Sequence, residues 1–288
     1  RCSRVASSIS ALCSPVLHLG RAWAASGVYR RQGSKSFRPA KSGWFGSKAE
    51  TRPIHNVTLQ VAQGEVVGIV GKRAAGKQTL ARTILGLTKP EVGKVTFLGQ
   101  DIAKLTRADK RKLRPLMRQV TPQSVAELDE SLTSHALLRE ALVDAKVSNA
   151  NEQKRRIAEA LRLVGLDHVA AQSELEDLSL FQQQLVAIAH AIVTRPRLVV
   201  VQDPAQGLDV SVQARLLDVL LKLQDELQLS MVISSTDIVM LGSLCDRLVV
   251  LRSGEIVEEG LAQQLLETPQ HAQSKMLLQQ ARDKEQAA

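Results

Sequence analysis

Residues 64–80 read GEVVGIVGKRAAGKQTL, and the rest of the chain is organised around this stretch. The apolar run 66–70 ends at Gly71, Gly76 and Lys77 follow, and a helix-compatible segment comes next, so the pattern predicts strand, tight loop and helix. The spacing G-x-x-x-x-G-K is typical of a loop that binds phosphate, because its backbone N–H groups and the helix N-terminus attract an anion while the lysine reaches the outer phosphates. An ordinary strand-to-helix turn can also contain such a glycine–lysine pair, so the rest of the chain must decide between the two.

The composition describes a chain that can bury a substantial core. It has 288 residues, of which 44% are hydrophobic, enough for one large domain or two small ones. Its longest apolar runs stay short of the roughly 18 residues that cross a bilayer, so we expect no direct membrane insertion. Cys2, Cys13 and Cys245 are sparse and odd in number, which argues against a disulfide scaffold and fits a reducing compartment.

The net charge of +9 comes from the first 49 residues, which contain nine Lys or Arg and no acidic residue. Five of the seven aromatic residues lie there too. Such an arm could contact nucleic acid or an anionic membrane surface, or be a solvated extension. No nucleic-acid recognition module accompanies it, so we expect no nucleic-acid partner. Residues 1–24 are predicted to be a basic N-terminal extension, whose opening is superficially similar to an organelle transit peptide.

Beyond residue 50, strand patterns alternate with helical patterns. Residues 57–61, 66–70 and 94–98 are predicted to form a small mixed sheet next to the phosphate loop. Helical spacing dominates residues 104–177, which predicts a helical subdomain. Further strands are predicted at 198–201, 230–234 and 247–251, and helices at 77–87, 183–193, 210–227 and 237–244. This alternation predicts a parallel sheet with helices on both faces and a ligand site beyond the strand C-termini.

Four stretches resemble one protein family. They are SKSFRPAKSGWF (34–45), GLDVSVQARLLDVLLKLQ (207–224), SGEIVEEG (253–260) and ETPQHAQSKMLL (267–278). They are similar to the ATP-binding subunits of ABC transporters, in the branch that imports oligopeptides, dipeptides and antimicrobial peptides. The resemblance implies an α/β P-loop NTPase fold: a mixed, mainly parallel sheet with helices on both faces, a small antiparallel β-subdomain and a helical subdomain. It places the nucleotide-binding domain at about 25–260, with the helical subdomain at about 104–177, and a C-terminal helical tail at 261–288.

The resemblance also implies roles for individual residues. Those that would contact ATP are Phe37, Gly71, Lys72, Arg73, Ala74, Ala75, Gly76, Lys77, Gln78, Thr79, Gln123, Ser179, Gln182 and Asp209. Phe37 would stack on adenine, and Gln123 would sense the metal and the transport partner. Ser179 and Gln182 belong to the family's signature loop, and Asp209 to its D-loop. The catalytic positions are Gln202, Asp203 and Thr236.

Several of these positions depart from the family pattern. The two that would hold or orient magnesium, 78 and 202, are both glutamine, and a neutral amide cannot balance a dication. Magnesium is therefore doubtful as a cofactor, and the sequence predicts no metal ligands. The catalytic carboxylate is shortened to Asp203 and the switch histidine is replaced by Thr236, so we expect hydrolysis to be impaired. Loss of a general base costs about 10²- to 10⁴-fold in rate.

The signature loop, usually Ser-Gly-Gly-Gln, reads Ser179-Leu180-Phe181-Gln182 here. Two side chains stand where glycines would allow close approach by a facing subunit. Meanwhile Lys72 and Arg73 add two cations within the phosphate loop. One hypothesis is that they replace the missing metal charge; the alternative is that they are solvated surface charges.

Three functions remain open from the sequence. The first is the ATP-binding subunit of a peptide importer, at the cytoplasmic face of the cell membrane, paired with a second, intact ATP-binding subunit as a heterodimer and with transmembrane permease subunits. The second is a non-hydrolysing regulatory or interaction subunit. The third is the ATP-binding subunit of the phosphonate carbon–phosphorus lyase system, which residues 207–218 and 259–271 resemble nearly as well.

Overall fold

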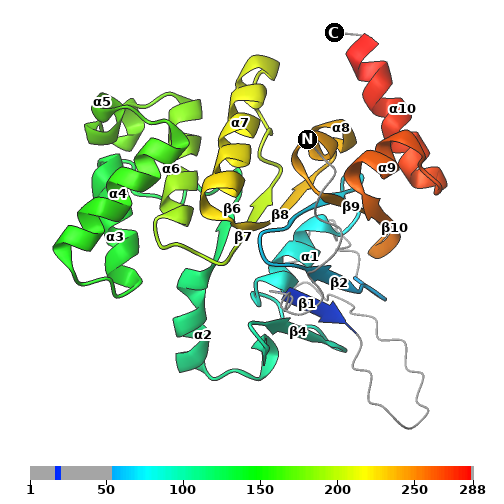
Figure 1. Cartoon of the computed structure of the whole chain (residues 1–288), viewed down its shortest axis with the longest axis horizontal. Coiled ribbons are helices and arrows are strands. Elements are labelled where there is room, and N and C mark those ends of the chain that lie inside the picture. The colour runs from blue at the N-terminus through cyan, green and yellow to red at the C-terminus, as the bar shows by residue number, and fades with distance from the viewer. Residues whose placement is uncertain (1–16, 21–53, 287–288) are drawn as a thin grey trace, which may run out of the picture.

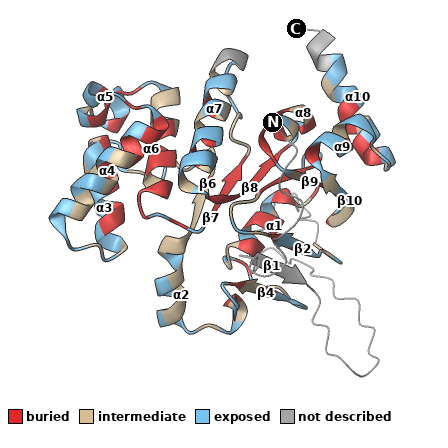
Figure 2. Cartoon of the chain, viewed as in Figure 1, coloured by how far each residue is buried: buried red, intermediate tan, exposed pale blue. Residues whose placement is uncertain are grey.

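The computed structural model describes residues 17–20 and 54–286, and it is built around a six-stranded sheet in the order β10-β9-β3-β8-β7-β6 (Figure 1). All neighbouring strands are parallel except β9 and β10. Its strands are β3 (Val66–Val70), β6 (Met117–Val120), β7 (Leu198–Gln202), β8 (Ser230–Ser235), β9 (Arg247–Arg252) and β10 (Glu255–Leu261). Every residue of β3, β7 and β8 is buried (Figure 2), as expected for parallel strands covered on both faces.

A second, antiparallel sheet has the order β2-β1-β4-β5. Its strands are β1 (Leu17–Gly20), β2 (Leu59–Val61), β4 (Lys94–Phe97) and β5 (Gln100–Asp101). The prediction of one small mixed sheet from residues 57–61, 66–70 and 94–98 is therefore wrong. β2 is buried on one face only and joins the antiparallel sheet, whereas β3 is apolar on both faces and joins the large one.

The strand β1 was not predicted, because four residues within a basic segment are too short a run to show a period. It lies between β2 and β4 and pairs antiparallel with both. The stretch 34–45, which includes Phe37, lies outside the described residues.

The helices cover the large sheet in two layers. They are α1 (Lys77–Ile84), α2 (Arg107–Leu113), α3 (Ser134–Asp144), α4 (Ala150–Val164), α5 (His168–Gln172), α6 (Leu180–Ile192), α7 (Val210–Leu227), α8 (Ile238–Leu244), α9 (Ala262–Glu267) and α10 (Ala272–Gln286), with short 3-10 turns η1 (Ile102–Lys104), η2 (Arg114–Leu116) and η3 (Leu175–Asp177). One layer is α1, enclosed between the two sheets, and the other contains α3–α10. Residues of β3 alternate between these layers: Val67 and Ile69 pack with α1, and Val66 and Val70 with the opposite layer.

The sequence predicted a helical subdomain at residues 104–177, but the structure shows that this region is not purely helical. It contains the strand β6, which pairs parallel with β7 at the edge of the large sheet. Its polar residues Arg118 and Gln119, both half-buried, hid the strand among the surrounding charged residues. The helices α3–α6 gather on one side of the sheet (Figure 1).

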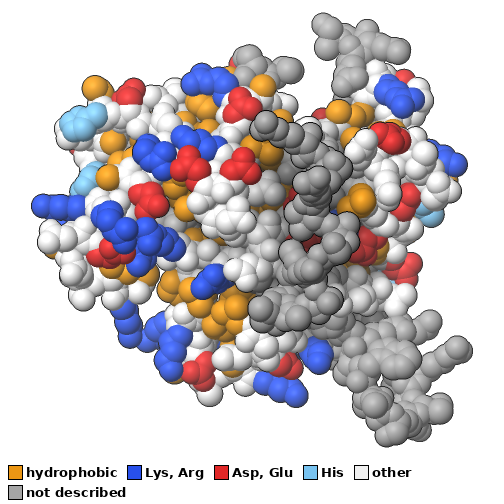
Figure 3. Space-filling model, in the orientation of Figure 1, with side chains coloured by type: hydrophobic (Ala, Val, Ile, Leu, Met, Phe, Trp, Pro, Cys, Tyr) orange, Lys and Arg blue, Asp and Glu red, His pale blue; other side chains and the backbone are white. Residues whose placement is uncertain are grey.

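Between the two sheets the chain passes through α2, none of whose residues is buried. Its cations are Arg107, Lys110, Arg111 and Lys112. In Figure 3, Lys and Arg side chains are visible over α2 and over the neighbouring helical part.

The parallel register brings the predicted site segments to one edge of the large sheet. The phosphate loop follows β3, Asp203 follows β7, Thr236 follows β8 and the Gln123 segment follows β6. Since these four strands are parallel, their carboxyl ends lie at the same edge.

Candidate functional site

The phosphate loop (residues 71–77) turns the chain from β3 into α1 through a backbone that only glycine allows at its first position. A Cβ on Gly71 would lie 2.5 Å from the Leu251 carbonyl oxygen and 3.1 Å from the Ala75 Cβ. The Gly71 N–H donates to the Ser235 carbonyl at 3.3 Å, which ties the loop to the end of β8. The Gly254 N–H donates to the Ala75 carbonyl at 2.9 Å, which ties it to the turn between β9 and β10.

The N-terminus of α1 has no side-chain cap. Its N-cap residue is Gly76, at φ 106°, and the first turn contains no acidic residue. The first backbone N–H groups of a helix have no partner within the helix, and together with the helix dipole they attract an anion. This end of α1 therefore has the chemistry of a phosphate site.

Lys77 is folded into the loop. Its ammonium Nζ donates to the Gly71 carbonyl at 2.8 Å and to the Lys72 carbonyl at 3.2 Å, and the residue is only 7% exposed. Burial lowers the pKa of Lys77, the nearby negative charge of Asp203 opposes that change, and the positive charge of Arg73 adds to it.

Asp203 lies directly after β7 and faces these cations. Burial raises the pKa of its carboxyl group, while the charges of Lys77 and Arg73 lower it. Its backbone is left-handed, at φ 42°, and its N–H donates to the Ser234 carbonyl at 2.8 Å. A non-glycine residue in this conformation costs on the order of 1 kcal/mol, which its hydrogen bond to β8 offsets. The structure thus brings Asp203 close to Lys77 and Arg73, although it lies far from them in the sequence.

The remaining predicted residues of this edge are placed as follows. Gln202 is buried at the end of β7, whereas Gln78 is exposed in the first turn of α1. Thr236 is exposed beyond β8, and Gln123 is exposed in the turn after β6. Lys72, Arg73 and Ala74 are exposed loop residues, Ala75 is buried, and Gly76 and Thr79 are half-buried.

This set of residues does not fit a magnesium ion. Mg²⁺ needs oxygen ligands in an octahedron with anionic charge close by. Gln78 and Gln202 are neutral, and the one carboxylate, Asp203, already faces two cations. Among the described residues, no three His, Cys, Asp or Glu side chains are grouped closely enough to hold a metal.

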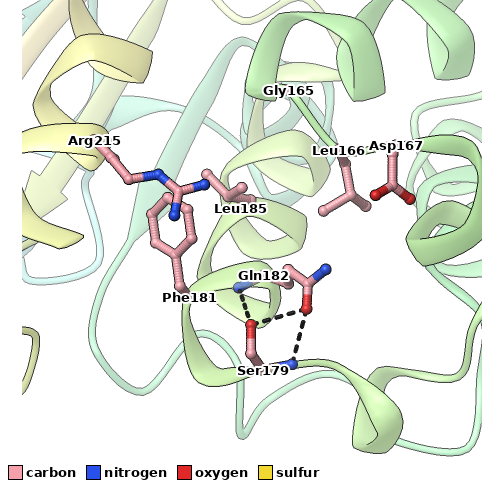
Figure 4. Close-up of a pocket in the computed structure, with 8 residues that line it drawn as sticks. All are labelled: Gly165, Leu166, Asp167, Ser179, Phe181, Gln182, Leu185 and Arg215. Carbon is pink, nitrogen blue, oxygen red and sulfur yellow. Dashed lines mark hydrogen bonds between the residues drawn. The ribbon is translucent and has the colours of Figure 1, made fainter.

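The signature loop (residues 179–182) is a different kind of helix start. Ser179 is the N-cap of α6, and it forms a complete capping box with Gln182. The Gln182 N–H donates to the Ser179 hydroxyl oxygen at 3.4 Å, and the Ser179 N–H donates to Gln182 Oε1 at 3.0 Å. The Ser179 hydroxyl also donates to Gln182 Oε1, at 2.8 Å (Figure 4). The backbone N–H groups of Ser179 and Gln182 are therefore paired within the loop.

Phe181 adds bulk to the same loop. The guanidinium of Arg215, on α7, lies 4.7 Å from the centre of its ring, a cation–π contact visible in Figure 4. The two residues lie at one side of a pocket of about 330 Å³, with Leu166 and Asp167 across from them. Leu180 is 55% exposed beside them. Sequence reasoning missed Arg215, because nothing in the spacing of residues 181 and 215 signals that α6 and α7 bring them together.

The pocket at the signature loop is separate from the phosphate loop. The lining of the 330 Å³ pocket comes from the turn after α4, from α6 and from α7, and includes no residue of the phosphate loop. Asp209, the N-cap of α7, is exposed, and its carbonyl rather than its side chain accepts from the Gln213 N–H at 2.9 Å. The predicted site residues thus form two separate groups.

None of the described helices combines the length and the apolar character that crossing a bilayer requires. Cys245 is buried, and burial raises the pKa of its thiol well above the ordinary value, which makes it a poor nucleophile.

The comparisons with known proteins agree with this geometry. A family model described as ABC transporter matches residues 54–206. The oligopeptide transport ATP-binding protein OppF of Lactococcus lactis is 31% identical over 245 residues, covering 85% of this chain and 77% of that protein. The oligopeptide transport ATP-binding protein OppD of Mycobacterium bovis is 34% identical over 229 residues; the match covers 80% of this chain and 37% of that longer protein.

Solved structures share the fold. CbiO1 of Clostridium perfringens, described as part of an ABC transporter complex, superposes with a TM-score of 0.73 at 22% identity, covering 88% of this chain and 91% of that one. A dimeric ATP-binding cassette bound to ADP and Pi superposes with a TM-score of 0.67 at 24% identity, covering 85% of this chain and 98% of that one. At this level of identity the two structures show a common fold.

Proposed function

This chain belongs to the ABC transporter family, and from that premise we propose that it is the ATP-binding subunit of a peptide import system whose own hydrolysis is impaired. The relatives that support peptide import are named for oligopeptide transport. The observation that carries ATP binding is the uncapped N-terminus of α1 with Lys77 folded against it.

The binding step uses this chain's own groups. The N–H groups of the first turn of α1 bind the phosphates of ATP. Lys77 exchanges the carbonyls of Gly71 and Lys72 for phosphate oxygens, and the gain of a charged acceptor outweighs the loss of two neutral ones.

Impaired hydrolysis follows from the strand ends. Asp203 would have to accept a proton from the attacking water, but its side chain is one methylene shorter than the glutamate usual in the family, and its charge also interacts with Lys77 and Arg73. Thr236 also lacks the ring nitrogen with which a histidine at this position would contact the terminal phosphate. A lost general base slows the step by about 10²- to 10⁴-fold.

We further propose the partners that such a subunit needs. A second ATP-binding subunit with intact catalytic residues would complete a heterodimer, and transmembrane permease subunits would receive the conformational change. This arrangement would hold the chain at the cytoplasmic face of the cell membrane through its partners.

The alternative of a non-hydrolysing regulatory subunit rests on the signature loop. Its capping box and its Phe181–Arg215 contact use the groups that would otherwise meet a facing nucleotide. The two proposals differ in whether the chain stimulates hydrolysis by an intact partner.

The test is an ATP hydrolysis assay on the isolated chain and on a restored variant carrying Gln78→Ser, Gln202→Asp, Asp203→Glu and Thr236→His. We expect the restored variant to be faster by about 100-fold or more. Equal rates, with the native chain turning over like an ordinary transport ATPase, would contradict impaired hydrolysis. Adding an intact paralogous subunit separates the alternatives: stimulation supports the transport subunit, and its absence supports the regulatory one.

A further inference from the structure

The phosphate loop differs from a magnesium-dependent nucleotide site in its neutral residues at positions 78 and 202 and in its additional cations. Gln78 is exposed and Gln202 is buried, and both are neutral where a divalent cation would need anionic or hydroxyl oxygens. A triphosphate bound at the end of α1 would still carry several negative charges that need compensation. The question is which groups supply it.

The cations next to that helix end are Lys72, Arg73 and Lys77. Lys72 and Arg73 are exposed, and in the described part of the chain neither forms a salt bridge. Lys77 points into the loop through its bonds to the carbonyls of Gly71 and Lys72. Among the described residues, Asp203 is the carboxylate whose charge acts on Lys77 and Arg73.

Three cations against one carboxylate leave an excess of positive charge at the loop. This excess attracts a polyphosphate directly, and it repels a second cation such as Mg²⁺ from the same place. An arginine can also form two parallel hydrogen bonds to a phosphate group.

We propose that the phosphate loop binds a nucleoside triphosphate without a divalent cation, and that Lys72 and Arg73 supply the positive charge in its place. This inference rests on the proposed function, because it concerns the same nucleotide site. It changes the form of the ligand from the magnesium complex to the free nucleotide, and it assigns a role to two residues of the loop.

The experiment measures the dissociation constant of ATP by isothermal titration calorimetry on the full chain, once with magnesium and once with excess EDTA. We expect the two constants to agree within about twofold. Affinity that falls tenfold or more in EDTA would overturn the inference and leave the proposed function standing. Failure to bind ATP in both buffers would overturn the inference and the proposed ATP-binding function together. This arm needs no variant, so it does not depend on any mutant folding.

A second arm tests the two side chains in EDTA. Lys72→Ala and Arg73→Ala are each expected to weaken ATP binding by about tenfold, and the double variant by about 30-fold or more. The matched control is Lys110→Ala with Arg111→Ala on α2, which removes the same two charges from a helix with no buried residue. An unchanged affinity in the loop double variant, or an equal loss in the α2 control, would overturn the inference.

Raising the salt concentration gives a third readout. Binding by exposed side-chain cations weakens as counterions screen them, so the EDTA affinity is expected to fall steeply with ionic strength in the native chain and less steeply in the loop double variant. Equal slopes would overturn the assignment of Lys72 and Arg73.

Discussion

Two helices of this protein begin at residues to which the family resemblance assigns nucleotide contact, and they begin in opposite ways. Helix α1 starts at Gly76, which has no side chain to cap the first N–H groups. Helix α6 starts at Ser179, whose hydroxyl, together with Gln182, satisfies the loop from within. The start of the helix is therefore uncapped at one place and capped by its own side chains at the other. The difference lies in the side chain at the N-cap rather than in the helix dipole, which both helices have.

The two loops differ in space as well as in hydrogen bonding. At Gly71 there is no room for even a Cβ, because the Leu251 carbonyl lies in its place. At the signature loop, Leu180 and Phe181 fill the space that glycines would leave, and Arg215 holds the ring. The phosphate loop begins at a position with no room for a side chain, whereas the signature loop is filled by side chains. The predictions below test this contrast, beginning with the largest expected effect.

Gly71→Ala should have the largest effect, because the added Cβ would clash with a backbone carbonyl that cannot move without displacing β9. We expect ATP affinity to fall by about 100-fold or more, and the free energy of unfolding to fall by about 1–3 kcal/mol, the usual cost of overpacking. Calorimetric titration and urea unfolding would measure the two. Gly260→Ala is the control, since a Cβ there would meet no atom within 4 Å. A Gly71 variant that binds ATP like the native chain would show that the loop tolerates bulk after all.

Leu180→Gly with Phe181→Gly should open the signature loop. Two glycines in the first turn of α6 should lower the free energy of unfolding by up to about 2 kcal/mol. In return, the loop could approach the phosphate loop of a second copy, so we expect a dimer in the presence of ATP that the native chain does not form. Sedimentation velocity would detect it. The double alanine variant is the control: it removes the bulk of both side chains without adding the backbone freedom of glycine. A native chain that dimerises equally well would contradict the role given to these side chains.

Some of this contrast could be predicted from sequence. The helix 210–227 is confirmed with its bounds unchanged, because its apolar residues repeat at helical spacing over 18 residues. The strand and loop at 66–77 are also confirmed, since a buried run followed by a glycine-rich turn has few other solutions. The grouping of Lys77 with Asp203 follows from the rule that ligand sites form at strand ends.

Other parts could not be predicted because their signals are not local. Strand β6 is polar and lies at an edge, so its pattern resembles that of the helices around it. Helix α6 was predicted to start at 183, but the capping box extends it to Leu180. The contact of Phe181 with Arg215 depends on the packing of α6 against α7, which neither segment encodes alone.

At acidic pH, the structure around α6 should open before the structure around α1. His190 lies on α6, and burial, assisted by the positive charge of Arg118 and opposed by Asp144, lowers its pKa to about 4. The unfolded chain, with a histidine pKa near 6.5, therefore binds the proton more readily than the folded chain, so stability falls as the pH falls from about 6.5 toward 4. We expect His190 to account for about 1–2 kcal/mol of the stability lost between pH 7 and pH 5.

The check is urea unfolding of His190→Gln at both pH values, with the exposed His168→Gln as the control. The His190 variant should lose less stability than the native chain on acidification. Hydrogen exchange should locate the acid-induced opening in α6 and β6, which the Arg118 side chain joins by donating to the His190 carbonyl at 3.4 Å. An identical pH dependence in both variants would rule out this group as the cause.

Ser179→Ala should remove the cap without touching the other loop. The loss of an N-cap hydroxyl lowers the free energy of unfolding by about 1 kcal/mol. ATP affinity should stay unchanged, because α1 provides the phosphate site. Ser243→Ala is the control, since its hydroxyl donates to the Met240 carbonyl within one helix and caps nothing. A loss of ATP affinity in Ser179→Ala alone would show that the two loops act as one site within a single chain.

The smallest effect concerns the Phe181–Arg215 contact, and a double-mutant cycle isolates it. Phe181→Leu keeps an apolar side chain in the loop, and Arg215→Gln keeps a polar one on α7, so each change removes the cation–π contact with little loss of packing. At an exposed site such a contact is worth about 0.5–1 kcal/mol. If the ring is held in place, we expect urea unfolding to give a coupling energy near 0.5 kcal/mol, which exceeds the error of the cycle. A coupling of zero would mean that Phe181 moves freely, and a mobile ring could swing away from a facing subunit. A measurable coupling means that Arg215 keeps the ring over the loop, so the signature loop stays closed even when α1 has its nucleotide bound.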